Sequence, residues 1–227
     1  FEKRSISTFS GGQQQRIAIA RAIVNEPEIL LLVPTLPEIE PFLRQQGKGY
    51  GPVVTGIGPY RCAAATQEAI IQRRPDMMIL CGIAGRYPAS ALAVGDAVLV
   101  GSERAADMGS FEGKGFVPKF SERYDCPHIP ADAPLPIVAS NSVSGAASPH
   151  VDRSAAQIEN MEGAAFFDVC LREQIPFWEL RTISNTVGEP FGQWNIPLAT
   201  DALARAIGRL LQTAENTYRT ARPSDDT

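Results

Sequence analysis

Apolar and polar residues alternate along the chain in short blocks, and these blocks predict buried strands. Residues 29–34 are leucine-rich and apolar almost throughout, which is typical of a strand covered on both faces of a sheet. Similar blocks return several times, bounded by glycine, proline or charged residues. We therefore expect further strands over residues 52–56, 77–82, 96–101, 137–140 and 177–184.

Longer stretches between these strands carry apolar residues at helical spacing. One helix begins near Arg61. We predict the others over residues 13–25, 154–173 and 197–219. Strands and helices in alternation predict an α/β fold, in which ligands bind at the ends of strands.

Two segments interrupt or follow this alternation. Residues 114–136 have no hydrophobic period and are rich in proline and charged residues, so we expect an excursion over the surface. The last residues, 221–227, are expected to form a disordered tail.

Composition and charge narrow the possible partners. The chain has 227 residues, of which 44% are hydrophobic and 20% charged, enough for one globular domain and an appendage. The net charge is −4, and acidic and basic residues are interspersed rather than grouped. A nucleic-acid partner is therefore not expected, because phosphate backbones require a basic surface.

Cysteine and histidine positions do not predict a metal site. The four cysteines are scattered without a CxxC pair, and the chain has only two histidines. No apolar run reaches the roughly 18 residues that a membrane-spanning helix needs, and no signal-peptide pattern opens the chain. We expect a cytoplasmic protein that has no membrane partner and needs no metal.

The beginning of the chain carries a motif of a different kind. The stretch "SGGQQQR" at residues 10–16 resembles the signature of ABC-transporter ATPases, in which a serine and backbone amides at a helix start contact nucleotide phosphates. Residues 6–32 share this resemblance. However, the sequence has no GxxxxGK[ST] phosphate loop, and Val33 and Pro34 stand in place of the family's acidic pair. We expect residues 1–28 to be a non-functional fragment that cannot hydrolyse ATP.

Two glycine turns follow predicted strands: "TGIGPYR" at residues 55–61 and "CGIAGRY" at residues 81–87. Small residues at such turns let the backbone approach a ligand, although they also simply permit a tight turn. Neither turn is the GxGxxG of dinucleotide-binding folds.

Together with other motifs, however, the two turns resemble a known superfamily. The resemblance to the nucleoside phosphorylase and nucleosidase superfamily extends over residues 30–211. It is carried, in order, by "GIGPYRCAAA", "PDMMILCGIAG", "VGDAVLVGSERAADMG", "NMEGAAFFDVC" and "ELRTISNTVG". Within that superfamily the motifs are most similar to the futalosine hydrolase family.

This resemblance implies a fold and an activity. Residues 29–220 should form one nucleosidase domain with a mixed central sheet flanked by helices, preceded by an N-terminal helical extension. The expected reaction is hydrolysis of the N-glycosidic bond of futalosine, which releases hypoxanthine without a metal or organic cofactor. Relatives form homo-oligomers, so a dimer or a higher assembly is expected.

Alternatives to this activity stay open. The first is a nucleosidase for methylthioadenosine or adenosylhomocysteine, and the second is a purine nucleoside phosphorylase, for which Arg61 could bind phosphate. The third is an inactive fusion that acts as a binding protein.

Cleavage of an N-glycosidic bond creates positive charge on the ribose, which a carboxylate can stabilise. Met161 and Glu162 match the family's Met-Glu pair, so the resemblance implies that Met161 packs on the ribose and Glu162 accepts bonds from its hydroxyls. The family usually has an acid two positions before this glutamate, whereas this chain has Asn160.

The attacking water needs a carboxylate that can accept its proton. The resemblance places this group shortly after the first strand and favours Glu40. Glu38 is the competitor, because prolines in "LPEIEP" leave the register open. Acids in this loop argue against phosphate as the nucleophile.

Asn185, in "TISNTVG", stands where adenine-cleaving relatives have an aspartate. An asparagine cannot give up a proton, but its N–H groups can donate to N7 and O6 of a 6-oxopurine. Hypoxanthine is therefore the expected base. Further candidates for substrate binding are Gly82, Ile83, Ala84, Val143, Ser144, Phe111 and Trp194.

Overall fold

The computed structural model describes residues 28–46, 51–113 and 115–221. The predicted helix over residues 13–25 and the expected tail beyond Ala221 lie outside the described residues.

The centre of the molecule is a mixed eight-stranded sheet, and its pairings follow the order β10-β4-β8-β9-β3-β1-β2. Because β10 also pairs with β3, the strands from β10 to β3 form a closed ring. Strand β7 lies outside this order and pairs with β4. The strands are β1 (Ile29–Val33), β2 (Val53–Val54), β3 (Met77–Arg86), β4 (Ala97–Ala105), β7 (Arg123–Asp125), β8 (Ile137–Ser142), β9 (Ile158–Asn160) and β10 (Phe177–Thr186). β1, β3 and β10 are parallel neighbours, so their carboxyl ends meet at one edge.

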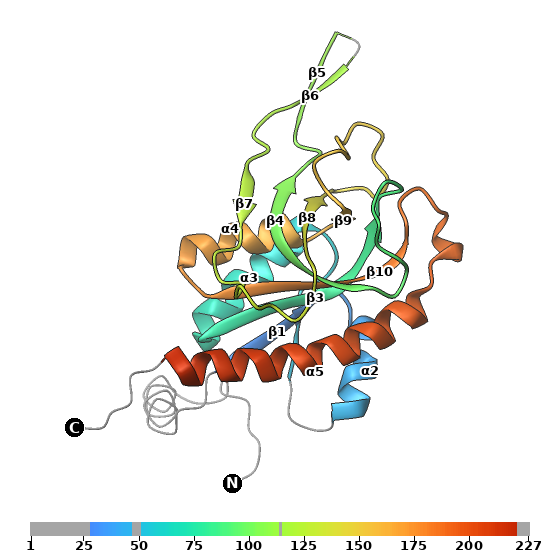
Figure 1. Cartoon of the computed structure of the whole chain (residues 1–227). Helices are drawn as coiled ribbons and strands as arrows, with labels where there is room; N and C mark the ends of the chain where they lie inside the picture. Colours follow the sequence, from blue (N-terminus) through green and yellow to red (C-terminus); the bar gives the residue numbers. More distant parts are fainter. Residues whose placement is uncertain (1–27, 47–50, 114, 222–227) are drawn as a thin grey trace, which may run out of the picture.

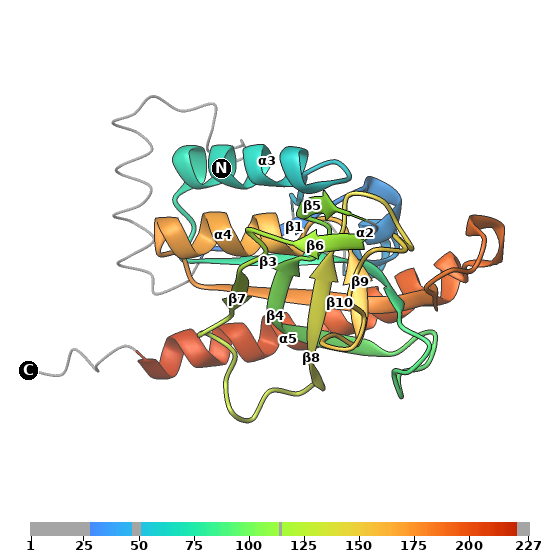
Figure 2. The same cartoon turned by 90° about the horizontal axis from the view of Figure 1, so that it is seen from above.

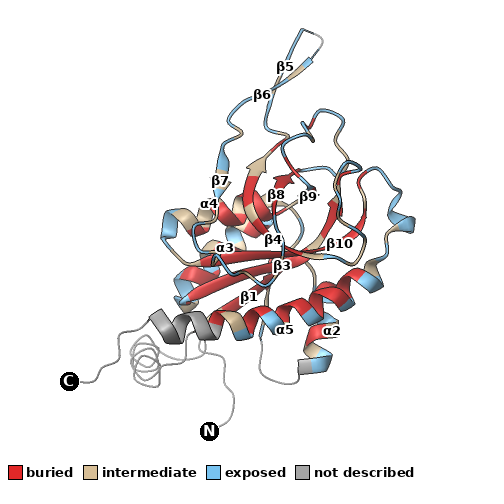
Figure 3. Cartoon of the chain, in the orientation of Figure 1, coloured by how far each residue is buried: buried red, intermediate tan, exposed pale blue. Residues whose placement is uncertain are grey.

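Helices cover the sheet on both faces (Figures 1 and 2). α3 (Pro59–Arg73) and α4 (Gly163–Glu173) pack against each other on one face, and α2 (Leu36–Gln46) and α5 (Ile196–Ala221) do so on the other. Strand periodicity explains this arrangement, because successive side chains point to opposite faces. Leu30 and Leu32 of β1 join the core under α3 and α4, whereas Leu31 and Val33 join the core under α5. In Figure 3, β1, β3 and β10 are coloured almost entirely as buried.

A short hairpin stands away from the sheet. It consists of β5 (Gly109–Glu112) and β6 (Gly115–Pro118), which pair antiparallel and project beyond the end of β4 (Figure 1). The predicted surface excursion over residues 114–136 thus includes two short strands, β6 and β7.

One prediction of secondary structure was wrong in its bounds, and one helix was missed. The helix expected over residues 154–173 begins only at Gly163, because residues 158–160 form β9 between β8 and β3. Helix α2 was not predicted, since Pro41 in its interior argues against a helix. It forms because Ile39 and Phe42 are buried in the core shared with α5.

No helix in the described part of the chain is long and apolar enough to cross a membrane. Within the same residues, no group of three or more metal-ligating side chains converges.

Candidate active site

A cavity of about 570 Å³ lies where the carboxyl ends of β1, β3 and β10 meet. This is the edge at which open α/β sheets bind ligands, and the volume suits a small molecule. Residues around β9 and the short 3-10 helix η2 (Phe191–Gln193) complete its wall. The cavity therefore combines segments from most of the chain.

Glu162 lies in the cavity wall, directly before α4, and is 4% exposed. Its Oε1 accepts the backbone N–H of Gly58 at 2.9 Å, and its Oε2 lies 3.3 Å from Nη2 of Arg181. Gly58 has φ of 95°, a left-handed conformation that favours glycine, at the start of α3. The glycine turn thus fixes one carboxylate oxygen, and Arg181 fixes the other. Met161, the preceding residue, also lines the cavity.

Glu38 is the second carboxylate in the wall and is 7% exposed. Its Oε1 accepts the hydroxyl of Thr35 at 2.7 Å, and its Oε2 accepts the N–H of Ile83 at 3.0 Å. Burial raises the pKa of Glu38, although these two hydrogen bonds act in the opposite direction. A carboxylate with a raised pKa is better suited to accept a proton.

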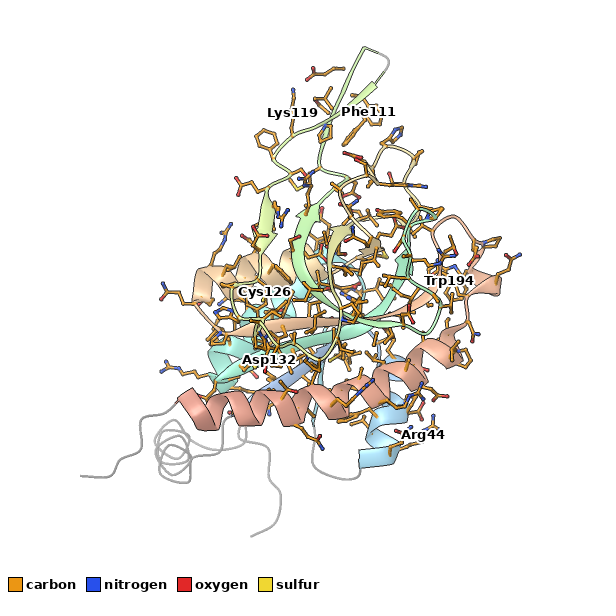
Figure 4. All side chains as sticks on the ribbon, viewed as in Figure 1. Arg44, Phe111, Lys119, Cys126, Asp132 and Trp194 are labelled. Atoms are coloured by element: carbon orange, nitrogen blue, oxygen red, sulfur yellow. The ribbon has the colours of Figure 1, made fainter. Side chains whose placement is uncertain are left out.

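Glu40 does not line the cavity, which corrects the preference for Glu40 over Glu38. Its side chain is 57% exposed and lies 3.9 Å from Arg44, one turn further along α2. Arg44 points away from the sheet (Figure 4). The physical reason is the helix itself: two residues differ by about 200° around the axis, so Glu38 and Glu40 cannot face the same side.

Asn185 is buried at the end of β10 and lines the cavity. Its Nδ2 lies 3.1 Å from the carbonyl oxygen of Thr186, which only accepts, so this atom must be the amide nitrogen. Its Oδ1 then accepts the Ser184 hydroxyl at 2.7 Å. One N–H of the amide is therefore already used inside the protein, and one is left for a ligand.

Four other predicted residues line the cavity: Ile83, Ala84, Val143 and Trp194. Trp194 donates its indole N–H to the carbonyl oxygen of Glu189 at 3.1 Å. It stands in the loop that leads into α5 (Figure 4).

Besides Glu40, three predicted residues are not brought into the cavity. Gly82 is packed under it, where a side chain would collide with Arg181. Ser144 is exposed and donates its backbone N–H to Asp107. Phe111 lies on the projecting hairpin, 68% exposed, with its ring 4.8 Å from that of His150 (Figure 4).

The sequence interpretation missed Arg181, the cation of this site. The signal was available: Glu179 and Arg181 are the two charged residues of an otherwise uncharged strand, and their spacing of two places them on one face. Arg181 is fully buried and donates from Nε to Glu179 Oε1 at 2.7 Å. A buried guanidinium holds carboxylates through several bonds at once.

The comparisons with known proteins address two parts of the chain separately. The family model of the ABC transporter matches residues 1–32. In agreement, spermidine/putrescine import ATP-binding proteins PotA of Desulfitobacterium hafniense and Clostridioides difficile are 61% and 59% identical over 46 residues. These residues are 20% of this chain, which spans only 13% of the length of those relatives.

Solved structures show the fold of the rest. A 5'-methylthioadenosine/S-adenosylhomocysteine nucleosidase from Helicobacter pylori has a TM-score of 0.69 at 18% identity, covering 83% of this chain and 99% of its own. A futalosine hydrolase mutant from the same species gives 0.69 at 18%, with 82% and 99% covered. The 5'-methylthioadenosine nucleosidase of Arabidopsis thaliana gives 0.69 at 19%, with 89% and 99% covered. The chain has the fold of these nucleosidases, as predicted.

Proposed function

We propose that this chain is an N-glycosyl hydrolase of purine nucleosides. The observation that carries the proposal is the meeting of two buried carboxylates, Glu38 and Glu162, in one cavity with the amide of Asn185 in the same wall. The nucleosidase fold of the structural relatives supports it.

Each of these groups has a part in the proposed reaction. Glu162 accepts hydrogen bonds from the ribose hydroxyls and stabilises the positive charge that develops on the sugar. Glu38, in the role first given to Glu40, orients a water molecule and takes its proton. Asn185 donates to the purine, whose N7 gains negative charge as the bond breaks. The bond from the sugar to the base nitrogen breaks and a bond to the oxygen of water forms, while the purine leaves as an anion that takes up a proton from solvent.

Asn185 also supports the choice of base. Its free N–H can be shared between N7 and O6 of hypoxanthine, both of which accept. With adenine, the same N–H would face the 6-amino group, a donor, so the contact is poorer. We therefore propose futalosine as the substrate. A nucleosidase for adenine nucleosides is the second candidate, favoured by the substrates named for two of the structural relatives.

The test is release of free base from futalosine, methylthioadenosine and inosine, with and without phosphate. We expect hypoxanthine from futalosine at a rate that phosphate does not change. Faster cleavage of methylthioadenosine would replace the proposed substrate. Cleavage only with phosphate would indicate a phosphorylase, and no cleavage of any nucleoside would leave an inactive binding protein.

We also propose that residues 29–220 act as one domain within a homo-oligomer, and that residues 1–28 take no part in catalysis. The projecting hairpin exposes Phe111, and the segment between β6 and β7 exposes Phe120; a neighbouring subunit could cover both side chains. Light scattering after size-exclusion chromatography would measure the assembly, and a single-chain mass would contradict it.

A further inference from the structure

Behind Glu162 lies a group of buried polar residues that the proposed reaction does not use directly. Glu103, Asn160 and Glu179 are each at most 5% exposed and surround Arg181. Two buried carboxylates so close to the site are costly unless each is held by defined partners. The partners of each residue show how this group bears on Glu162.

The side chain of Asn160 takes part in five hydrogen bonds, which use both its oxygen and its nitrogen. Its Oδ1 accepts three N–H groups: from Glu162 at 2.8 Å, from Gly163 at 2.7 Å and from Nη2 of Arg181 at 3.0 Å. Its Nδ2 donates to Glu103 Oε1 at 2.5 Å and to Ser140 Oγ at 2.8 Å. Donors therefore converge on one end of the amide, and acceptors on the other.

Glu103 holds Asn160 in this orientation. A rotation of the amide by 180° would place its NH₂ against three donors and its oxygen against the Glu103 carboxylate, so it is strongly disfavoured. Glu103 is fixed in turn, because its Oε2 accepts the Ser142 hydroxyl at 2.9 Å. Ser142 Oγ accepts the backbone N–H of Ala164 at 2.7 Å, which ties the group to the first turn of α4.

Through Asn160, this arrangement reaches both ends of Glu162. Asn160 fixes the backbone N–H of Glu162 and also Nη2 of Arg181, the same atom that lies 3.3 Å from Glu162 Oε2. Displacement of Asn160 would therefore move the backbone and the charged partner of the carboxylate together. Displacements of this kind are costly in an active site, where groups act only in a narrow geometry.

Charge explains why an amide fits at position 160. The charged groups that face Asn160 and Glu103 are Arg181, Glu162 and Glu179, with Glu38 beyond Arg181. Burial raises the pKa of both Glu103 and Glu179, and the neighbouring Glu103 carboxylate raises that of Glu179 further. An acid at position 160 would place another carboxylate directly against Glu103, whereas the amide supplies a donor without charge.

We propose that Glu103 and Asn160 are a matched positioning pair that holds Glu162 and Arg181 in the geometry for catalysis. The catalytic part of this inference rests on the proposed function, whereas the pairing itself does not.

An exchange of the two groups tests the pair. Asn160→Asp puts a carboxylate against Glu103, so we expect kcat to fall about 10²-fold at pH 8, as for loss of one preorganised polar contact, with a smaller change in KM. Adding Glu103→Gln restores the hydrogen bond in the opposite direction: the amide nitrogen at position 103 now donates to the new carboxylate at position 160. The double variant should regain at least about tenfold over Asn160→Asp, within the range of coupling between residues in contact.

The pH dependence gives a readout that a purely structural role would not move. In Asn160→Asp alone, the two facing carboxylates can share one proton, so its activity relative to wild type should be highest at low pH and fall as pH rises. The double variant lacks the second carboxylate and should lose this dependence. Glu103→Gln alone should lower kcat only about threefold to tenfold, because its amide oxygen can still accept from Asn160.

Glu179→Gln is the matched control, since it also removes a buried acid near Arg181 but has no hydrogen bond to Asn160 in the structure. Combined with Asn160→Asp it should restore nothing. Equal rescue by both glutamine variants, or a double variant no better than Asn160→Asp, would overturn the pair.

Unfolding by denaturant makes the test independent of activity. Asn160→Asp should unfold at lower denaturant concentration, and Glu103→Gln should recover part of the loss. If the wild type cleaves no nucleoside, the proposed function fails, and this unfolding cycle alone decides whether the pair exists. Additive effects on stability would contradict it.

Discussion

The floor and the rim of the cavity differ in almost every physical respect. On the floor, Glu38, Glu162 and Arg181 are charged, almost fully buried and held by hydrogen bonds from separate strands and turns. At the rim, Ile57 and Phe191 are apolar and more than half exposed, with exposed fractions of 56% and 69%. Trp194 joins them, its ring 5.0 Å from that of Phe191.

The floor and the rim are therefore suited to different tasks, catalysis and binding. The floor is organised before a ligand arrives, which is the condition for stabilising a transition state without reorganisation. The rim offers apolar surface that gains most when a ligand covers it, which strengthens binding in the ground state and the transition state alike. Changes to the floor should therefore lower kcat, and changes to the rim should raise KM.

The largest effect is expected at Glu38. Glu38→Gln removes the group that we propose accepts the proton of water, so kcat should fall about 10³-fold, within the usual range for a general base. Because burial raises the pKa of Glu38, wild-type kcat/KM should be low at acidic pH and rise as the carboxylate ionises, with a midpoint above the ordinary 4.5. Steady-state kinetics from about pH 4 to about pH 9, the range into which burial can move a glutamate pKa, would measure both.

Glu40→Gln is the control for this prediction, since Glu40 is exposed two positions further along α2. Its activity should stay within about twofold of wild type. A large loss for Glu40→Gln with normal activity for Glu38→Gln would reverse the assignment made from the geometry.

Glu162→Gln should have the next largest effect. The volume is kept, but the charge proposed to stabilise the developing sugar cation is lost, so kcat should fall about 10²-fold or more. KM should change less, because this interaction strengthens only in the transition state. Turnover within a few-fold of wild type would exclude Glu162 from the proposed role.

Asn185→Asp should change the choice of base rather than abolish cleavage. The new carboxylate would face the Thr186 carbonyl oxygen, now 3.1 Å from the amide nitrogen, and would favour a protonated form. Such an acid could donate to N7 of adenine, so the kcat/KM ratio of futalosine to its 6-amino analogue should fall at least about tenfold.

Ser184→Ala provides the comparison for Asn185→Asp. It removes the hydroxyl that holds Oδ1 but leaves the amide, so both substrates should be affected alike. If Asn185→Asp leaves the kcat/KM ratio of the two substrates unchanged, Asn185 does not determine which purine base is cleaved.

The contrast between floor and rim also shows what sequence reasoning could reach. The strands over residues 29–34 and 77–82 were predictable because burial on both faces makes them apolar along their length. Glu162 and Asn185 were found because each belongs to a short local motif next to a strand or helix end.

The rest of the site depends on contacts that are distant along the chain. To choose between Glu38 and Glu40 one must know that both lie on helix α2, and Pro41 kept that helix from being predicted. Once the helix is known, only one of the two residues can face the cavity. Asn160 and Glu103 are separated by 57 positions, and the pairing of β8 with β4 and β9 brings them together. No local pattern contains that information.

At the rim, a smaller effect is expected. Trp194→Ala removes an apolar wall of the cavity, so KM should rise about fivefold to tenfold while kcat stays within about threefold, as for lost uniform binding. Phe111→Ala is the matched control, because its ring lies on the hairpin and not in the cavity wall. A fall in kcat for Trp194→Ala without a change in KM would place Trp194 among the groups of the floor.

The smallest effect is expected from deletion of the segment that resembles ABC transporters. The deletion should end at Pro27, because Glu28 is part of the domain: its backbone N–H donates to Asp76 at 2.8 Å, and its side chain pairs with Arg73 at 3.3 Å. All proposed catalytic groups lie beyond β1, so kcat and KM should stay within about twofold of the full chain.

Equilibrium dialysis with labelled ATP should detect no binding to either form, since the chain has no GxxxxGK[ST] loop to hold the phosphates. ATP binding that disappears on deletion would show that the segment keeps a function of its own. Loss of nucleosidase activity without loss of stability would instead connect residues 1–27 to the cavity, and the proposed division of the chain at residue 28 would be wrong.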